Sequence, residues 1–440
     1  MNILLLSGGS GKRLWPLSNE VRSKQFIKLF KNEKGEYESM LQRVYRQIKT
    51  VDPDANIMIA ASKSQISTIK NQLGDTVPVC VEPCRKDTFP AIVLAVSYLH
   101  DELNFNEKES IVVCPVDPYV DISYFESVKK LQKLAEEGTT NLTLMGIKPD
   151  YPSEKYGYII PENGCQVSPV KEFKEKPDKE TAEIYIKRNA LWNAGVFAFK
   201  IQYLLQTAHR MIEFDDYRGL FNKYDTLEKL SFDYAVVEKE KSIQVLSYSG
   251  AWKDVGTWNF MTEVMADPIQ GRALMDNSCT NTNIVNELNI PILCMGCRDM
   301  IVAASGDGIL VADKAQSDYM KPYVEKVFTD VHYAEKSWGL YNVIDVQPGS
   351  MTVKIFIKAG EHMSYHMHNY RDEIWTIVSG KGKAVVDGIE QIMRVGDVIT
   401  IAAGCKHTVE AITDLNIIET QIGEDINVSD KKKYPMPDQV

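Results

Sequence analysis

Short apolar runs alternate with helix-length amphipathic stretches through the first 260 residues. Apolar runs without polar alternation are typical of strands that are buried on both faces of a sheet. Such strands are predicted at residues 3–6, 57–61, 77–81, 110–114, 142–147, 195–199 and 243–247. Stretches such as 91–99 and 127–136 have the apolar spacing of amphipathic helices. Residues 1–260 are therefore predicted to form one α/β domain of repeated strand–helix–strand units.

The pattern changes over residues 261–330, which we predict to be a small β-rich linker domain. Polar residues crowd its first part, and short apolar runs follow. The sequence Ser-Gly-Asp-Gly at 305–308 predicts a tight hairpin turn between strands at 300–304 and 309–312. A helix over 315–328 is expected to close this domain.

Roughly the last hundred residues alternate strands with glycine turns, for example at 374–380, 382–388 and 397–401. Strands of this kind close into small β-barrels. We therefore assign residues 331–430 to a β-barrel domain and residues 431–440 to a C-terminal tail.

Length, charge and composition argue against several classes of function. At 440 residues the chain is long enough for two or three domains. A net charge of −10 argues against a non-specific nucleic-acid binder. No stretch approaches the roughly 18 apolar residues of a membrane span, and no basic-then-apolar leader opens the chain, so we expect a cytoplasmic protein without membrane contact. The eight cysteines lack the spacing of a zinc site and are expected to be buried free thiols.

The polar turn after the first predicted strand is the most informative stretch. Residues 7–11 read Ser-Gly-Gly-Ser-Gly, so backbone N–H groups there can close on an anion. Lys12 and Arg13 add positive charge at its end. The spacing matches neither G-x-x-x-x-G-K nor G-x-G-x-x-G, and a simple turn is the alternative. At the carboxyl end of a first strand, such a turn predicts a phosphate site.

The residues around this turn resemble a known family. The pattern G-G-x-G-x-R-L-x-P-L at 8–17, followed by S-K-Q-F at 23–26, resembles the sugar-nucleotide pyrophosphorylases, and K-Q-F is most similar to the mannose-1-phosphate guanylyltransferases among them. The resemblance implies a Rossmann-like nucleotidyltransferase domain that transfers GMP from GTP to mannose 1-phosphate and releases pyrophosphate. It also implies that the linker that follows is β-helix-like. It implies nucleotide binding by Gly8, Gly9, Gly11, Glu82, Asp87 and Thr88.

Two features of the sequence bear on the expected recognition of the nucleotide base. Asp87 stands where asparagine is commoner in the family. The chemistry of the residue types does not select guanine over another base. The segment 82–91, taken alone, is also a plausible helix start with Pro-Ala at its entry.

A carboxylate ends the apolar run 112–116. Asp117 there either caps the next helix or binds a metal, and a hard oxygen ligand suits Mg²⁺ because that ion bridges phosphates. The family usually has Asp-His where this chain has Asp117-Pro118. The resemblance implies that Asp254 is the second Mg²⁺ ligand. The expected catalytic residues are Arg13, Lys24, Asp117 and Asp254, with Arg13 on the leaving pyrophosphate because guanidinium binds phosphate bidentately.

Further motifs are implied to bind the sugar phosphate. Their residues are Tyr156, Gly157, Glu175, Lys176 and Asn193. Lysine suits a phosphate because it is a mobile point charge. Taken alone, the stretch 171–178 also fits a solvated run of alternating charge, and Asn-Ala-Gly fits a simple turn.

A second constellation lies in the barrel. Residues 360–380 match the cupin motif G-x5-H-x-H-x4-E-x6-G in full. His366 and His368 point to one face because the side-chain period of a strand is two. Glu373 and His407 complete a His₃Glu set that suits Zn, Mn, Fe or Ni. The alternative is a cupin barrel that has lost its metal.

The barrel also resembles the type II phosphomannose isomerase domain that is fused to guanylyltransferases. The resemblance rests on Lys-Ser-Trp-Gly at 336–339, the segment 371–375 and the segment 418–426, and it adds Arg371 as a candidate site residue. The family generally has Q-x-H-H-H-R-x-E-H-W, and this chain retains the metal set but lacks several acid–base side chains. Glu361, His362 and Lys354 are candidates for the missing base.

These observations leave a main reading and an alternative. The main reading is a GTP:mannose-1-phosphate guanylyltransferase with Mg²⁺ at the transferase site, working as a homodimer, with mannose-6-phosphate isomerase activity in the cupin left open. The alternative is a nucleotidyltransferase for another sugar 1-phosphate, with a cupin that binds sugar or joins two copies without chemistry.

Overall fold

The computed structural model describes residues 1–9, 12–327, 331–427 and 430–436. The chain divides into two compact units, residues 1–10 with 25–266 and residues 11–24 with 267–440. The short segment 11–24 thus leaves the first unit and folds with the second. No helix among the described ranges is long and apolar enough to span a membrane.

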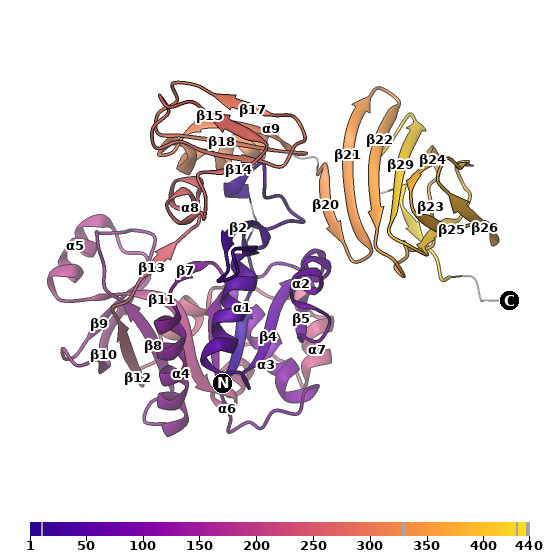
Figure 1. The fold of residues 1–440 in the computed structure, drawn as a ribbon. Coiled ribbons are helices and arrows are strands. Elements are labelled where there is room, and N and C mark those ends of the chain that lie inside the picture. Colours follow the sequence, from indigo (N-terminus) through magenta and orange to yellow (C-terminus); the bar gives the residue numbers. More distant parts are fainter. Residues whose placement is uncertain (10–11, 328–330, 428–429, 437–440) are drawn as a thin grey trace. The chain divides into compact units, whose positions relative to one another are not determined.

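The first unit is built on a nine-stranded mixed sheet (Figure 1). Its order is β5 (Val79–Glu82), β4 (Asn56–Ser62), β1 (Asn2–Leu6), β6 (Ser110–Pro115), β11 (Leu191–Lys200), β8 (Leu142–Ile147), β12 (Ile243–Tyr248), β10 (Val167–Lys174) and β9 (Tyr158–Pro161). β1 pairs in parallel with β4 and β6, whereas β11 runs antiparallel to β6 and β8. The predicted α/β class is confirmed, and all seven predicted strands are present.

Helices cover both faces of this sheet (Figure 1). α1 (Met40–Val51) packs with α4 (Ile122–Glu137), and α3 (Thr88–Asp101) packs with α6 (Ile201–His209) and α7 (Tyr217–Asn222). Leu4 and Val113 on the central strands and Val93 on α3 are fully buried in the same core. The apolar runs of the sequence become strands because both of their faces are covered.

The linker lies at the start of the long segment 267–440 of the second unit, and it is built mainly from short parallel strands. β14 (Ile269–Gly271), β16 (Asn283–Asn286) and β18 (Met300–Ser305) pair in parallel, as do β15 (Ala273–Met275) and β17 (Ile292–Cys294). β18 continues through the predicted turn into antiparallel β19 (Gly308–Asp313).

The helix predicted over 315–328 is interrupted. A 3₁₀ turn, η6 (Gln316–Tyr319), precedes α9 (Lys321–Val327), and residue 328 lies outside the described residues. A continuous α-helix would need an N–H at position 322, and Pro322 has none.

The C-terminal domain is a barrel of two sheets. One has the order β20 (Tyr333–Lys336), β21 (Gly339–Gln347), β22 (Ser350–Ile357), β29 (Leu415–Gly423), β24 (Arg371–Ser379) and β27 (Val398–Ile401). The other has the order β26 (Ile389–Arg394), β25 (Lys381–Val386), β28 (His407–Ala411), β23 (His366–Met367) and β30 (Lys432–Lys433). Trp375, Val353 and Ile417 are fully buried between the sheets.

Two sequence expectations differ from the structure here. Residues 432–433, expected in a tail, form β30, because the edge of β23 is open to pairing with them. All eight cysteines are free, but only Cys80, Cys114 and Cys294 are buried, and Cys165 is exposed.

Candidate functional site

Asp117 and Asp254 line the same cavity although they are far apart in the chain. Asp117 lies between β6 and β7 (Pro118–Val120), and Asp254 ends β13 (Trp252–Asp254). β7 and β13 pair antiparallel with Asp254 opposite Pro118, so the strand pairing itself brings the two aspartates together. The cavity has a volume of about 190 Å³. Two carboxylates beside one cavity are the hard oxygen donors that a divalent metal requires.

The glycine turn lies at the carboxyl end of β1, beside the strand that leads to Asp117. Ser7 N–H donates to the Ala60 carbonyl (2.9 Å), and Val116 N–H donates to the Leu6 carbonyl (3.3 Å). A Cβ added at Gly8 or Gly9 would meet nothing within 4 Å. Because this side of the turn is open, a phosphate can approach the backbone there. Gly11 lies outside the described residues.

Gln25, the first residue after the segment 11–24, is hydrogen-bonded to the start of this turn. Its Nε2 donates to both the carbonyl and the hydroxyl of Ser7, at 3.0 Å each. Lys12, Arg13 and Lys24 lie on the intervening segment, which folds with the second unit. Arg13 is exposed, whereas Lys12 is half-buried with its Nζ 3.4 Å from Glu20.

The expected nucleotide-binding residues of the 82–88 loop take part in local hydrogen bonds. Glu82 accepts from the Lys86 N–H (3.1 Å) and the Tyr224 hydroxyl (3.0 Å), and burial raises its pKa. Asp87 caps α3 by accepting from Thr88 N–H (2.8 Å). The Thr88 hydroxyl accepts from an N–H of Phe232 (2.8 Å). These bonds hold the loop in shape.

Four of the five expected sugar-binding residues line the cavity of the two aspartates. They are Tyr156, Gly157, Glu175 and Asn193. The Tyr156 hydroxyl donates to Asp254 Oδ2 (3.4 Å), and burial raises the pKa of this tyrosine. A Cβ added at position 157 would lie 2.5 Å from Glu175 Oε2, so any larger residue there would displace the Glu175 carboxylate.

Lys176, the fifth, is paired with a cavity residue. Its Nζ lies 2.6 Å from Glu175 Oε1. Burial opposes the charge of this lysine, but the hydrogen bond to Glu175 and the nearby negative charges together outweigh it, and the pKa of Lys176 is raised. Glu175 therefore has one oxygen on Lys176 and the other beside Gly157.

Asp233 also lines this cavity, and sequence reasoning assigned it no role. It begins the π-helical turn Asp233–Val237, and Asn193 Nδ2 donates to its Oδ1 (2.6 Å). Desolvation, assisted by the nearby charge of Glu175, raises the pKa of Asp233 to about 7. π-Helical turns are frequent at functional sites. The available sequence signal was an acidic residue followed by the apolar stretch 235–237.

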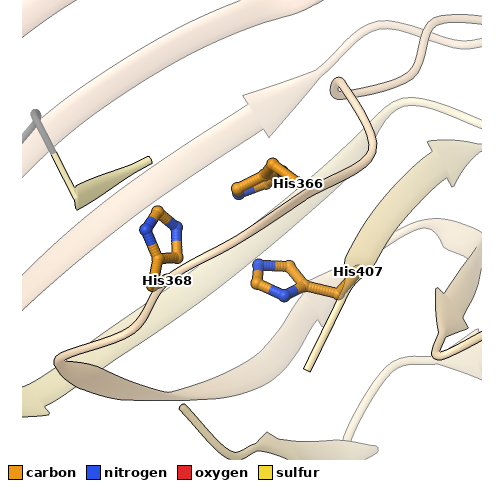
Figure 2. A group of neighbouring side chains, drawn as sticks. All are labelled: His366, His368 and His407. Atoms are coloured by element: carbon orange, nitrogen blue, oxygen red, sulfur yellow. The ribbon is translucent and has the colours of Figure 1, made fainter. Parts of the chain in front are cut away.

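The second candidate site is a histidine triad inside the barrel. Figure 2 shows the rings of His366, His368 and His407 turned toward one another, and their ligand nitrogens lie within 4.8 Å of each other. His366 and His407 are directly paired across β23 and β28. His366 Nδ1 donates to the Ser364 carbonyl and His407 Nδ1 donates to the Cys405 carbonyl. These bonds leave Nε2 of both rings as the lone-pair nitrogen that a metal binds.

Glu373 lies against the triad. Its Oε1 is 3.2 Å from His368 Nε2, and its Oε2 is 3.2 Å from His407 Nε2. Burial opposes ionisation, but the two histidines hold the pKa of Glu373 well below its usual range, and burial lowers the pKa of His366 to about 2. Glu373 Oε2 and His407 Nε2 are buried and lack a hydrogen-bond partner among the described residues. A carboxylate and neutral imidazoles with unsatisfied atoms fit a metal site.

Arg371 shares this site. Its Nη2 donates to His368 Nε2 (3.0 Å), and its Nε donates to Glu373 Oε1 (3.3 Å). Behind it, Glu419 accepts from Trp375 Nε1 (3.0 Å), and burial raises the pKa of Glu419 to about 7. Sequence reasoning assigned no role to Glu419.

The proposed bases of the cupin are not at the triad. Lys354, Glu361 and His362 are all exposed. Lys354 alternates along β22 with buried Val353 and Ile355, so its side chain points away from the barrel core. Their exposure does not support these three residues as a base acting on a sugar inside the barrel.

Comparison with known proteins identifies the families that the two parts of the chain match. A nucleotidyl transferase family model matches residues 2–270, and a mannose-6-phosphate isomerase C-terminal model matches residues 324–434. The chain is 27% identical to mannose-1-phosphate guanylyltransferase 2 of Escherichia coli O157:H7, over 99% of this chain and 98% of that protein. It is 29% identical to the xanthan biosynthesis protein XanB of Xanthomonas campestris pv. campestris (strain B100), over 98% and 97%.

A solved structure extends the comparison. The crystal structure of a mannose-1-phosphate geranyltransferase from Thermus thermophilus superposes with a TM-score of 0.61 at 27% identity, covering 74% of this chain and 98% of that one. The family match spans more than half of the chain and contains both cavity aspartates. The chain belongs to the nucleotidyl transferase family, and a mannose-6-phosphate isomerase C-terminal domain follows its transferase domain.

Proposed function

We propose that this enzyme transfers GMP from GTP to mannose 1-phosphate and releases pyrophosphate. The observation that carries the proposal is the single cavity that Asp117 and Asp254 share with Glu175 and Asn193. The full-length similarity to mannose-1-phosphate guanylyltransferases supports the choice of base and sugar.

In the reaction, an oxygen of the sugar 1-phosphate attacks the α-phosphorus of the triphosphate. The bond between that phosphorus and the oxygen bridging to the β-phosphate breaks, and pyrophosphate leaves with this oxygen. The chain has to position two phosphates and neutralise their charge. We assign that task to the backbone of Gly8 and Gly9, with Gly11, and to the side chains of Arg13 and Lys24.

Asp117 and Asp254 are the residues that would hold Mg²⁺. When bound, the ion supplies charge neutralisation to the reacting phosphates. The support in the structure is the donor set itself, two carboxylates brought to one cavity by the pairing of β7 with β13.

Substrate contacts follow from the same cavity and loop. We assign the sugar hydroxyls to Glu175 and Asn193, the sugar phosphate to Lys176, and packing beside them to Tyr156 and Gly157. The nucleotide base is assigned to the loop that carries Glu82, Asp87 and Thr88. Its local hydrogen bonds support this assignment because they fix the shape of the loop.

We further propose that the cupin holds one divalent transition metal through His366, His368, His407 and Glu373, with Zn, Mn, Fe and Ni as candidates. The unsatisfied buried atoms of Glu373 and His407 favour this function. Arg371 competes for His368 Nε2, so metal binding would release its guanidinium toward an anionic ligand. Turnover of mannose 6-phosphate to fructose 6-phosphate tests whether the site is an isomerase.

The transferase proposal is tested by measuring pyrophosphate release over a panel of GTP, ATP, UTP and dTTP with mannose 1-phosphate and glucose 1-phosphate. The pair GTP and mannose 1-phosphate should give the highest kcat/KM. A higher value for another pair would contradict the assigned substrates. We also propose that the enzyme acts in the cytoplasm, because GTP is available in that compartment. We propose in addition that it forms a homodimer, which light scattering of the purified protein tests.

A further inference from the structure

The linker holds the segment that carries Arg13 and Lys24. Arg22 makes a bidentate ion pair with Glu287, with Nη1 to Oε2 at 2.7 Å and Nη2 to Oε1 at 2.9 Å. Arg22 is only 7% exposed, and its guanidinium also lies 5.3 Å from the ring centroid of Tyr333. Parallel double hydrogen bonds of this type fix orientation as well as distance.

A second carboxylate of the linker fixes the same segment. Asn19 Nδ2 donates to Asp307 Oδ2 (2.6 Å), while Asn19 Oδ1 accepts from the N–H groups of Val21 (2.9 Å) and Arg22 (2.7 Å). Asn19 therefore joins the turn of the segment to the linker. The other oxygen of Asp307 accepts from the N–H of His332 (2.6 Å) at the start of the barrel.

Further contacts leave the segment little freedom. The Ser305 hydroxyl donates to the Pro16 carbonyl (2.6 Å), and a Cβ added at Gly308 would lie 2.4 Å from the Trp15 ring. α9 packs against the 3₁₀ turn η1 (Lys12–Leu14). Arg13 lies within this turn but is exposed, while the residues that follow it over 14–19 are buried.

This pattern separates two tasks within one segment. The buried residues bind the linker, and the exposed Arg13 is left to meet a ligand. Burying the charge of Arg22 is costly unless its partner is held in good geometry, so Arg22 and Glu287 have to stay together. The linker carboxylates thereby decide where the backbone of residues 12–24 lies.

We propose that Glu287 and Asp307 are positioning residues of the transferase, acting through Arg22 and Asn19 on the segment that presents Arg13 and Lys24. The inference rests on the proposed transferase function. In this proposal the linker positions residues of the transferase site in addition to connecting the two domains. Neither carboxylate belongs to the sequence patterns that carried the family resemblance.

The test compares Glu287→Gln and Asp307→Asn with wild type in pyrophosphate release from GTP and mannose 1-phosphate. Each variant should lower kcat by about 10-fold or more, since small displacements of a positioned group cost up to about 100-fold. The KM for mannose 1-phosphate should change by less than about twofold, because first-unit residues line the sugar cavity. Asp276→Asn is the matched control, a linker carboxylate whose partners are Ser278, Cys279 and Gly296.

A double variant and an activity-independent readout complete the design. Arg22→Lys keeps the charge but loses the double hydrogen bond, so Arg22→Lys combined with Glu287→Gln should be no slower than the slower single variant. Amide exchange over residues 12–24 should rise in Glu287→Gln and Asp307→Asn but not in Asp276→Asn.

The outcomes are distinguishable. If wild type turns over and Glu287→Gln and Asp307→Asn keep kcat within about twofold, the positioning role is overturned, even if both melt earlier. If wild type gives no turnover with any substrate pair, the proposed function fails, and unchanged amide exchange over 12–24 would then overturn the positioning role as well.

Discussion

Asp254 lies opposite Pro118 across two short antiparallel strands, and this pairing sets its carboxylate beside one cavity with Asp117. The two strands are minor elements outside the main sheet. Their pairing nevertheless brings two carboxylates to the cavity that Glu175, Asn193 and Asp233 also line.

A side chain at position 157 should displace the Glu175 carboxylate. Gly157→Ala places a Cβ 2.5 Å from Glu175 Oε2 and 3.0 Å from the Phe173 ring, so Glu175 must move. We expect KM for mannose 1-phosphate to rise about 10-fold or more, in line with the cost of misplacing a binding group. Gly164→Ala is the matched control because an added Cβ there meets nothing within 4 Å. Equal KM values for the two variants would contradict the close approach.

Asp233 should make stability depend on pH. Its folded-state pKa of about 7 lies above the ordinary value of 3.8, so the folded chain binds the extra proton between those values. Stability from this group is fully present below about pH 4 and is lost as pH rises through 7. The charged groups that act on it are Glu175, which raises its pKa, and Lys176, which lowers it.

The corresponding measurement is Tm from pH 4 to pH 8 for wild type and Asp233→Asn. The asparagine keeps the acceptor for Asn193 Nδ2 and removes the charge. We expect Asp233→Asn to melt above wild type at pH 8, with the difference shrinking toward pH 4. A difference that is constant with pH would show that Asp233 does not titrate as described.

The barrel should bind one metal through buried residues. His407→Ala and Glu373→Gln should each reduce the metal content of the purified protein from about one per chain to a small fraction, because each removes a ligand. His362→Ala is the control, an exposed histidine outside the triad. Elemental analysis and the Tm after chelation read out the result without any activity assay. Metal retained in His407→Ala would argue against the triad as the site.

Elements governed by local patterns could be predicted from the sequence. The strand at 142–147 has the predicted bounds because every residue in it is buried, and the hairpin after residue 305 follows its glycine and aspartate. The single helix predicted over 315–328 is instead a 3₁₀ turn followed by a shorter helix, and Pro322, which lacks an N–H, lies beside the break. Short edge strands such as β30 carry too little pattern to be seen.

Contacts between distant parts of the chain could not be predicted in this way. No spacing rule joins Asp117 to Asp254, and only the resemblance brought them into one hypothesis. Residues 12–24 belong to the second unit, where Arg22 pairs with Glu287, and nothing local to that segment signals this pairing. Asp233 was assigned no role from the sequence because its surroundings depend on Asn193 and Glu175, which lie in other parts of the chain.

The central claim is that Asp117 and Asp254 act together on a metal-bound triphosphate. Its most direct test is the initial rate of pyrophosphate release from GTP and mannose 1-phosphate by Asp117→Asn and Asp254→Asn over a range of Mg²⁺ concentrations. Asp75→Asn, an exposed carboxylate paired with Lys70, is the control. Both site variants should fall by about 100-fold or more and need more Mg²⁺ for half-maximal rate, while the control keeps the wild-type rate. A rate within about threefold of wild type in either site variant would contradict the account.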